Sequence, residues 1–242
     1  LFSTITSYIS TPLRALPSVL REGPEEGLLR LSASHPQRSS RQRLLRMLIH
    51  SAAAPATLAR LYTIWRDRSE PLLNETDYTD LAYSLAVRLP DRSDSIVRTQ
   101  RTRLTDPDRI RRFDFISRAM TPDTAALDSL FRSLLIPENR RIEPWTSALL
   151  GWLNHPTRER HAVRYIRPAL DALRDVQRTG DIFFPRDWVG ALLRNHRSPE
   201  AYRALLDFID ANPGYPPLLL NKVWQAAYPL YRANGEVDRV HE

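Results

Sequence analysis

The chain contains no cysteine, which excludes disulfide bonds and thiolate-ligated metal sites. Glycine is also scarce: seven residues are scattered along 242 positions, and they form neither a phosphate-binding loop nor a Gly-x-Ser-x-Gly nucleophile turn. No apolar run approaches the roughly 18 residues that a membrane span needs. The composition therefore predicts no membrane span, no thiolate-ligated metal site, no phosphate-binding loop and no serine nucleophile turn. It does not indicate the cellular compartment.

Lysine is almost absent, because Lys222 is the only one and the other 34 of the 35 basic residues are arginine. The formal net charge is +7, but acidic residues are interleaved with the arginines along most of the chain. This mixing is typical of solvated helix faces with i,i+4 ion pairs rather than of a basic docking stripe. We therefore predict no nucleic-acid partner, and an arginine-rich nucleic-acid-binding protein is kept only as a third hypothesis.

Histidines show no metal-ligand pattern. His155 and His161 lie six positions apart with Glu159 between them, whereas a helical zinc site needs two histidines at i and i+4. Pro156 interrupts the turn as well, so surface or helix-capping roles are favoured for both rings. We predict no metal, no cofactor and no catalytic residue within this chain.

Proline, by contrast, is frequent and regularly spaced. From Pro55 to Pro137 it recurs every 15 to 19 residues, about one helix length. Proline is placed at helix starts and in connections because it lacks an N–H and clashes with a preceding turn. Between the prolines, apolar residues follow the i, i+3, i+4, i+7 pattern of helices. Examples are Leu127, Leu130, Phe131 and Leu134 after Pro122, and Trp145, Ala148, Leu149 and Trp152 after Pro144. The sequence predicts an all-α fold of short antiparallel helices.

One internal similarity occurs at an offset of 43 residues. Trp145, Ala148, Leu149, Leu150 and Pro156 match Trp188, Ala191, Leu192, Leu193 and Pro199. This period fits two-helix units and predicts a curved stack, a HEAT- or armadillo-like superhelix. Similar packing demands on amphipathic helices can also produce such a match without a repeat.

Composition divides the chain into three predicted regions. Residues 1–36 are irregular, interrupted by Gly23-Pro24 and His35-Pro36, and we expect short helices there that pack on a missing neighbouring domain. Residues 37–232 form the helical-repeat-like domain, and residues 233–242 a polar tail. The chain starts at Leu1 without signal-peptide features, so we expect it to be a piece of a longer protein.

Helix starts are predicted where a polar residue precedes a proline. These pairs are Asp106-Pro107, Thr121-Pro122, Glu143-Pro144 and Ser198-Pro199, with Ser40 as a further cap for a helix from Arg41 onward. Pro168 is expected to kink or split a helix over residues 163–173, and residues 211–217 to form a rigid loop before the last helix.

Arginine clusters are the remaining candidates for a site. The group from Arg98 to Arg112 and the group from Arg38 to Arg46 have few aromatic neighbours in sequence, so solvated helix faces explain them best. A third group differs, since Arg140 and Arg141 stand just before Trp145 at a helix start. We select Arg140 and Arg141 as candidates for a carboxylate contact; the alternative is that they cap the preceding helix or pair with nearby glutamates.

Three segments carry a resemblance to a known family. They are residues 106–114 (DPDRIRRFD), residues 139–145 (NRRIEPW) and residues 178–185 (RTGDIFFP) with Trp188. Together they resemble the C-terminal helical domain of bacterial zinc aminopeptidases of the aminopeptidase N family. The likeness covers most of residues 40–232.

The resemblance implies a non-catalytic domain. Family members hold zinc with H-E-x-x-H and a downstream glutamate, and the substrate amine with Gly-x-Met-Glu-Asn, and this chain has none of these motifs. It would cover the catalytic domain of the same parent chain, which holds the zinc and removes N-terminal residues from peptides. Arg140 and Arg141 would face the chamber that admits the peptide substrates. The alternative is a stand-alone helical-repeat scaffold that binds a protein partner.

Overall fold

The structure is a computed structural model that describes residues 20–234. Within that range every element is an α-helix or a short 3-10 helix, and there is no strand. The predicted all-α fold is confirmed. The curved superhelix stays a prediction, because the contacts divide the chain into two units, Leu1–Thr105 and Asp106–Glu242, which are described separately.

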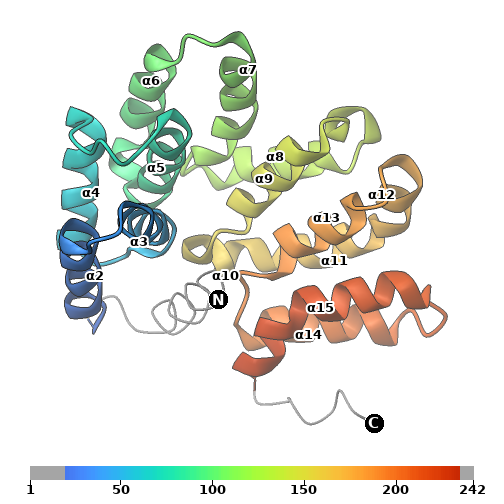
Figure 1. Cartoon of the computed structure of the whole chain (residues 1–242). Helices are drawn as coiled ribbons and strands as arrows, with labels where there is room; N and C mark the ends of the chain where they lie inside the picture. Colours follow the sequence, from blue (N-terminus) through green and yellow to red (C-terminus); the bar gives the residue numbers. More distant parts are fainter. Residues whose placement is uncertain (1–19, 235–242) are drawn as a thin grey trace. The chain divides into compact units, whose positions relative to one another are not determined.

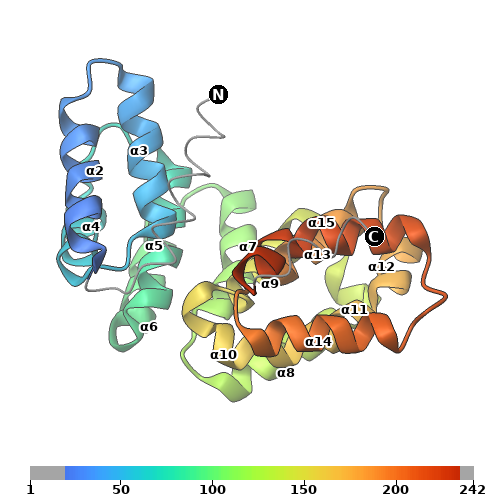
Figure 2. The same ribbon diagram turned by 90° about the horizontal axis from the view of Figure 1, so that it is seen from below.

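Unit 1 is a set of antiparallel helices in two layers (Figures 1 and 2). Helix α2 packs on α3 and α4, α3 packs on α5, and α5 also contacts α4 and α6. Helix α2 thus contacts the next two helices, and α5 contacts the helices before and after it. The helices are α2 (Glu22–Ser34), α3 (Arg38–Ser51), α4 (Pro55–Asp67), α5 (Glu75–Arg88), η2 (Pro90–Arg92) and α6 (Ser93–Arg103).

The predicted boundary near residue 36 does not coincide with the division of the structure. Residues 22–34 form one continuous helix that packs on α3, so they belong with the helices that follow. Pro24 lies in the first turn of α2, where its missing N–H removes no intrahelical bond. Residues 1–19 of the predicted irregular segment, and residues 235–242 of the predicted tail, lie outside the described residues.

Side chains of unit 1 complete the helix ends of their neighbours. Glu25 of α2 is buried and accepts hydrogen bonds from the backbone N–H groups of Ala53 (2.9 Å) and Ala54 (3.1 Å) at the start of α4. Arg103 of α6 donates to the carbonyl of Trp65 at 2.9 Å, near the end of α4, and lies over the Trp65 ring. These contacts satisfy backbone groups that a helix leaves without partners at its termini.

Unit 2 has two rows of helices. Figure 1 shows α9, α13 and α15 side by side, and α7 packs on the free side of α9. In the other row α11 packs on α14 and against α13. The elements are α7 (Pro107–Ile116), η3 (Ser117–Met120), α8 (Thr124–Leu134), η4 (Pro137–Arg140), α9 (Glu143–Leu153), η5 (Pro156–Arg158), α10 (Glu159–Ala162), η6 (Val163–Tyr165), α11 (Ile166–Asp171), α12 (Leu173–Thr179), α13 (Phe184–Leu193), α14 (Pro199–Asp210) and α15 (Pro217–Ala233).

The contact between α9 and α13 gives the 43-residue similarity a structural counterpart, because its two copies are neighbouring helices. Side-chain hydrogen bonds in unit 2 also join residues 35 to 42 positions apart. This separation is close to the length of one helix pair in a HEAT- or armadillo-type stack. Several links in unit 2 thus share a similar sequence spacing, and a repeat of helix pairs stays a prediction.

Two of the predicted helix starts are confirmed, and others differ by a few residues. Asp106 and Ser198 cap α7 and α14, each accepting a hydrogen bond from the backbone N–H three residues later. Helix α8 starts two residues later than predicted, because Asp123 caps it. Helix α3 begins at Arg38, so the predicted cap Ser40 lies inside it and is buried.

The helix predicted over residues 163–173 is interrupted before and after Pro168 and not at Pro168 itself. The chain forms η6, then α11, which contains Pro168 in its first turn, and then α12. Proline is tolerated in a first turn, so the breaks fall at Tyr165 and Ala172. Residues 211–216 connect α14 to α15, as the predicted loop requires.

Candidate functional site

The structure separates the two candidate arginines. Arg140, at the end of η4, is only 2% exposed, and its guanidinium donates to the carbonyls of Leu134 (3.3 Å) and Leu135 (2.9 Å) at the C-terminus of α8. The other side of the guanidinium contacts Asp175 and donates to Thr179 Oγ1 at 3.2 Å, both on α12. Arg140 therefore ties α8 to α12 and has no open face for a peptide, so capping, the structural alternative, accounts for it.

Arg141 is exposed, and its side chain makes no hydrogen bond or ion pair among residues 20–234. Its role as a substrate-chamber residue stays a prediction. Glu143, expected to pair with the arginines, has another function: its Oε1 accepts a hydrogen bond of 2.8 Å from the backbone N–H of Asp181, in the loop before α13. The loops before α9 and α13 are thereby joined.

The loop between α12 and α13 is held closely at Gly180. A Cβ added there would lie 2.5 Å from Phe184 Cδ1 and 2.9 Å from Glu143 Oε1, so a larger residue would displace both. Asp181 lies two residues before the N-cap Phe183 and accepts hydrogen bonds from the N–H groups of Phe183 (2.7 Å) and Phe184 (2.8 Å). Hydrogen bonds from Arg178 and Arg140 lower the pKa of the Asp175 carboxyl on the neighbouring helix.

A buried polar junction connects α9, α10 and the loop before α14. His196 is fully buried, and its Nε2 donates to Asn154 Oδ1 at 3.0 Å. Its Nδ1 lies 3.8 Å from Glu159 Oε1, an oxygen that also accepts from the N–H groups of Arg197 (2.5 Å) and Ser198 (2.6 Å). Burial lowers the pKa of His196 to about 4, so the ring is neutral at pH 7.

The two histidines weighed as metal ligands have separate structural roles. His155 is buried and caps η5, as the capping interpretation predicts, with its Nδ1 accepting from the N–H of Thr157 at 3.3 Å. His161 lies 2.8 Å from Asp128 Oδ1, which also accepts a 2.7 Å hydrogen bond from Tyr165. That bond from Tyr165 is the main cause of the lowered pKa of Asp128. The cluster anchors α8 against α10 and η6.

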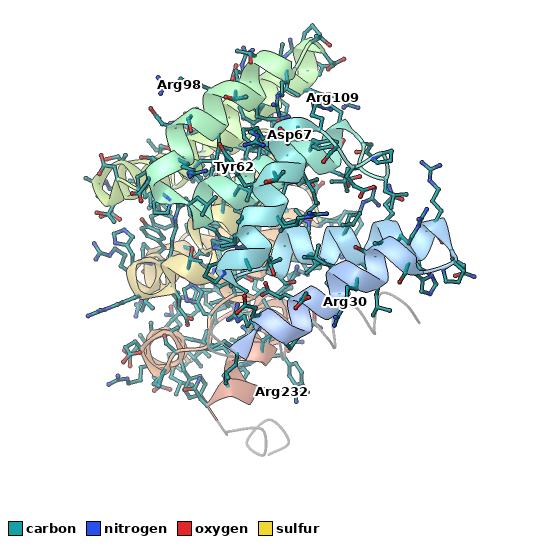
Figure 3. All side chains as sticks on the ribbon, turned by 90° about the vertical axis from the view of Figure 1, so that its left-hand side faces the viewer. Arg30, Tyr62, Asp67, Arg98, Arg109 and Arg232 are labelled. Atoms are coloured by element: carbon teal, nitrogen blue, oxygen red, sulfur yellow. The ribbon has the colours of Figure 1, made fainter. Side chains whose placement is uncertain are left out.

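The arginines of the group 98–112 are divided between the two units. Figure 3 shows Tyr62 and Asp67 on α4 and Arg98 on the neighbouring α6 of unit 1. Arg98 is exposed and pairs with Asp94 at 3.3 Å, one turn earlier. In unit 2, Arg111 pairs with Asp108 in the same way. Exposed ion pairs of this kind are typical of solvated helix faces, and each contributes little to the free energy of unfolding.

Unit 1 contains an open depression of about 420 Å³ between α3 and the start of α5. Arg46 forms a bidentate ion pair with Asp77 (2.6 and 3.1 Å), and Asp77 closes a capping box with Asn74. The hydrogen bond with Asp77 raises the pKa of Arg46. The Asp77 carboxylate is already engaged by Arg46 and by the capping box, so it is not available to a ligand. The ion pair and the cap are explained by their stabilising effect on the start of α5.

Unit 2 also exposes several large apolar side chains, of which Phe183 is partly covered by Arg186, 5.5 Å from the ring centroid. Five large apolar side chains on loops and helix starts are 47 to 80% exposed. In Figure 1 the loops that precede α9, α13 and α15 lie at one edge of this unit. We call these residues the apolar rim: Ile136, Ile142, Ile182, Phe183 and Leu218.

Sequence reasoning missed the apolar rim. Ile182, Phe183 and Phe184 precede Pro185 as one apolar run, yet only Phe184 is buried. The apolar run is visible in the sequence, but which of its members is buried depends on the turn that Asp181 forms with Phe183 and Phe184 before α13. Periodicity cannot supply this, since it applies only inside the helix.

Among residues 20–234, no group of three or more histidine, aspartate or glutamate side chains could hold a metal ion. None of the helices in that range is long and apolar enough to cross a bilayer. No protein-family model matches the chain, and no curated protein matches it significantly. The apolar rim and the exposed Arg141 are therefore the candidate functional features that the geometry offers.

Proposed function

We propose that this chain is the non-catalytic C-terminal helical domain of a zinc aminopeptidase of the aminopeptidase N family. In this proposal the catalytic domain of the same parent chain holds the zinc and removes N-terminal residues from peptides. The helical domain covers that catalytic domain and shapes the chamber that peptides enter. The parent is the enzyme, and the present residues supply no catalytic group.

The observation that carries the proposal is a contact between two of the segments that resemble the family. Glu143 of the segment NRRIEPW accepts a hydrogen bond from Asp181 of the segment RTGDIFFP, and Arg140 donates to Thr179. Gly180 is the residue that allows this approach. The two segments, 33 or more positions apart in sequence, are one structural joint. A resemblance that includes both sides of one joint supports a shared domain more strongly than two unrelated matches.

The stacking of helix pairs also supports the proposal. The links at separations of 35 to 42 residues match the two-helix unit of HEAT- and armadillo-type domains. Such stacks present extended surfaces that cover a partner rather than enclosed catalytic pockets.

An assay of the purified chain tests the proposal. We expect no hydrolysis of aminoacyl-anilides with or without added zinc, and no stoichiometric zinc after dialysis. A mock preparation from cells that lack the gene controls for contaminating peptidases. Hydrolysis that co-purifies with the chain would place catalytic groups within these 242 residues and overturn the proposal.

Arg141 tests the chamber assignment in the intact enzyme. We expect Arg141→Ala to raise KM for peptides about fivefold, the effect of roughly 1 kcal/mol, through a lost contact with the peptide carboxylate. KM for a small chromogenic anilide, which lacks that carboxylate, should stay unchanged. Arg203→Ala, at an exposed arginine of α14 that pairs with Glu200, is the matched control. An equal rise of KM for both substrates would contradict the assignment.

A further inference from the structure

We propose that Asn234, at the end of α15, is a self-modifying site, where deamidation turns a structural amide into a carboxylate and frees the helix end from the loop before α14. Asn234 is followed by Gly235, and this is the one Asn–Gly pair among the seven asparagines of the sequence. The inference does not depend on the aminopeptidase assignment, because it rests on this pair and on the hydrogen bonds of the Asn234 side chain.

The reaction needs only water. The backbone nitrogen of Gly235 attacks Cγ of Asn234, the bond from Cγ to Nδ2 breaks, and Nδ2 leaves as ammonia with the proton of the Gly235 amide. Water then opens the resulting five-membered succinimide at either carbonyl, which gives aspartate or isoaspartate. Glycine favours the first step because it has no Cβ to hinder the approach of its nitrogen.

The other six asparagines are less suited to this ring closure. Five of them precede a residue with a side chain that hinders the attack, and Asn212 precedes Pro213, whose nitrogen has no proton to lose. Asn234 is therefore the asparagine of this chain that is most prone to the reaction.

The Asn234 side chain has a structural role that the reaction destroys. Its Nδ2 donates to the carbonyl of Leu230 at 2.8 Å, one turn earlier, and to the carbonyl of Arg197 at 3.3 Å, in the loop before α14. A carboxylate has no proton to donate to either oxygen. It also places a negative charge at the C-terminus of a helix, where the helix dipole disfavours it. The product therefore cannot restore the contact that the amide made.

The lost contact belongs to the loop that holds His196 in its buried junction. The N–H groups of Arg197 and Ser198 donate to Glu159 of α10. Asn234 of α15 binds the carbonyl of Arg197 in the same loop. The loop is thus linked both to α10 and to the end of α15. Deamidation removes the second link, so we expect the loop to open more often.

The same two hydrogen bonds of Nδ2 control the rate of the reaction. Ring closure requires the side chain to rotate toward Gly235, so the bonds to Leu230 and Arg197 must open first. Helix ends fray, and Asn234 is only half-buried, so this opening does not require global unfolding. Each opening allows a step whose product cannot re-form the closed state.

Peptide mapping by mass spectrometry tests the proposal after the purified chain has stood in mildly alkaline buffer for weeks. We expect the peptide with Asn234 to gain the mass difference between OH and NH2 and to separate into aspartate and isoaspartate forms. Gly235→Ala should slow this conversion about tenfold, because the added Cβ hinders ring closure. Gly214→Ala is the matched control, since a Cβ there meets no atom within 4 Å, and it should leave the rate unchanged.

Unfolding in urea supplies the reference rate. We expect the unfolded chain to convert Asn234 about tenfold faster than the folded chain, the effect of the two hydrogen bonds. A folded chain that keeps Asn234 intact when the unfolded sample is fully converted overturns the proposal, and so does conversion of the other asparagines at the same rate. Equal rates in both samples would show that the bonds do not hold the amide, and would overturn it as well.

Hydrogen exchange tests the structural consequence. Asn234→Asp, a stable form of one product, should raise the exchange rates of the Arg197 and Ser198 amides at least about threefold, the effect of one lost hydrogen bond. Asn221→Asp, which adds the same charge at an exposed position of α15, is the matched control and should leave these rates unchanged. Wild-type exchange in Asn234→Asp would show that the amide does not hold the loop, and the proposed release would be wrong.

Discussion

Replacement of Arg140 by alanine is expected to destabilise unit 2 by about 3–5 kcal/mol. The guanidinium is 2% exposed, and its loss leaves the carbonyls of Leu134 and Leu135 without their donor and leaves the Asp175 carboxylate with Arg178 alone. Each such group then loses hydrogen bonds that water cannot easily replace. The cavity left by the side chain adds to the cost.

The adjacent Arg141→Ala is the matched control, and it should change the free energy of unfolding by less than about 0.5 kcal/mol because the residue is exposed. Urea unfolding followed by tryptophan fluorescence measures both, since four of the five tryptophans lie in unit 2. If the two variants unfold at the same urea concentration, the structural role assigned to Arg140 is wrong.

Acid is expected to destabilise unit 2 by about 3 kcal/mol through His196 alone. Burial, opposed in part by Glu159 and aided by Arg197, lowers the pKa of His196 from 6.5 to about 4. The unfolded chain takes up this proton below pH 6.5, whereas the folded chain does so only near pH 4. Between these values the unfolded state binds more protons, so stability falls as the pH falls from about 6.5 to about 4 and changes no further on this account below that.

His196→Gln removes this titration and keeps a donor for Asn154. Carboxylates titrate in the same range, so the informative quantity is the difference between wild type and variant at each pH. We expect wild type to lose about 3 kcal/mol more than His196→Gln between pH 7 and pH 4. His35→Gln, in unit 1, should lose as much as wild type. Parallel pH profiles for wild type and His196→Gln would show that the ring is solvated or charged at neutral pH.

The comparison of Arg140 with Arg141 shows where sequence reasoning ends. Both stand in the same short loop, and the sequence assigns them one role. The two residues differ because the Arg140 side chain, at the end of η4, lies between α8 and α12, whereas Arg141 is exposed to solvent. That direction depends on contacts with residues about 35 positions away, which no local pattern contains.

Helix faces illustrate the same limit. On α8 all four predicted stripe residues, from Leu127 to Leu134, are buried. On α9 the prediction placed Trp145, Ala148, Leu149 and Trp152 inside, and of these only Leu149 is fully buried. The structure buries Thr146, Leu149, Leu150 and Leu153 instead. Because α9 is apolar on nearly every side, with α7 and α13 as neighbours, periodicity cannot select a single face.

Helix starts could be predicted from the sequence where the capping side chain belongs to the same helix. Asp106 and Ser198 start α7 and α14 because their side chains bond the next turn of their own helix. Glu143, in contrast, bonds Asp181 of a distant loop, and α9 starts without a side-chain cap. The joint that carries the proposed function was therefore visible in sequence only as two separate segments.

The reading frame that encodes this chain, determined on the full-length transcript, tests the proposed function most directly. The proposal predicts that the same frame encodes, upstream of these helices, H-E-x-x-H with a downstream glutamate and a Gly-x-Met-Glu-Asn strand. A frame that encodes the helices with no such metal-binding segment would contradict the aminopeptidase assignment and leave a stand-alone helical scaffold.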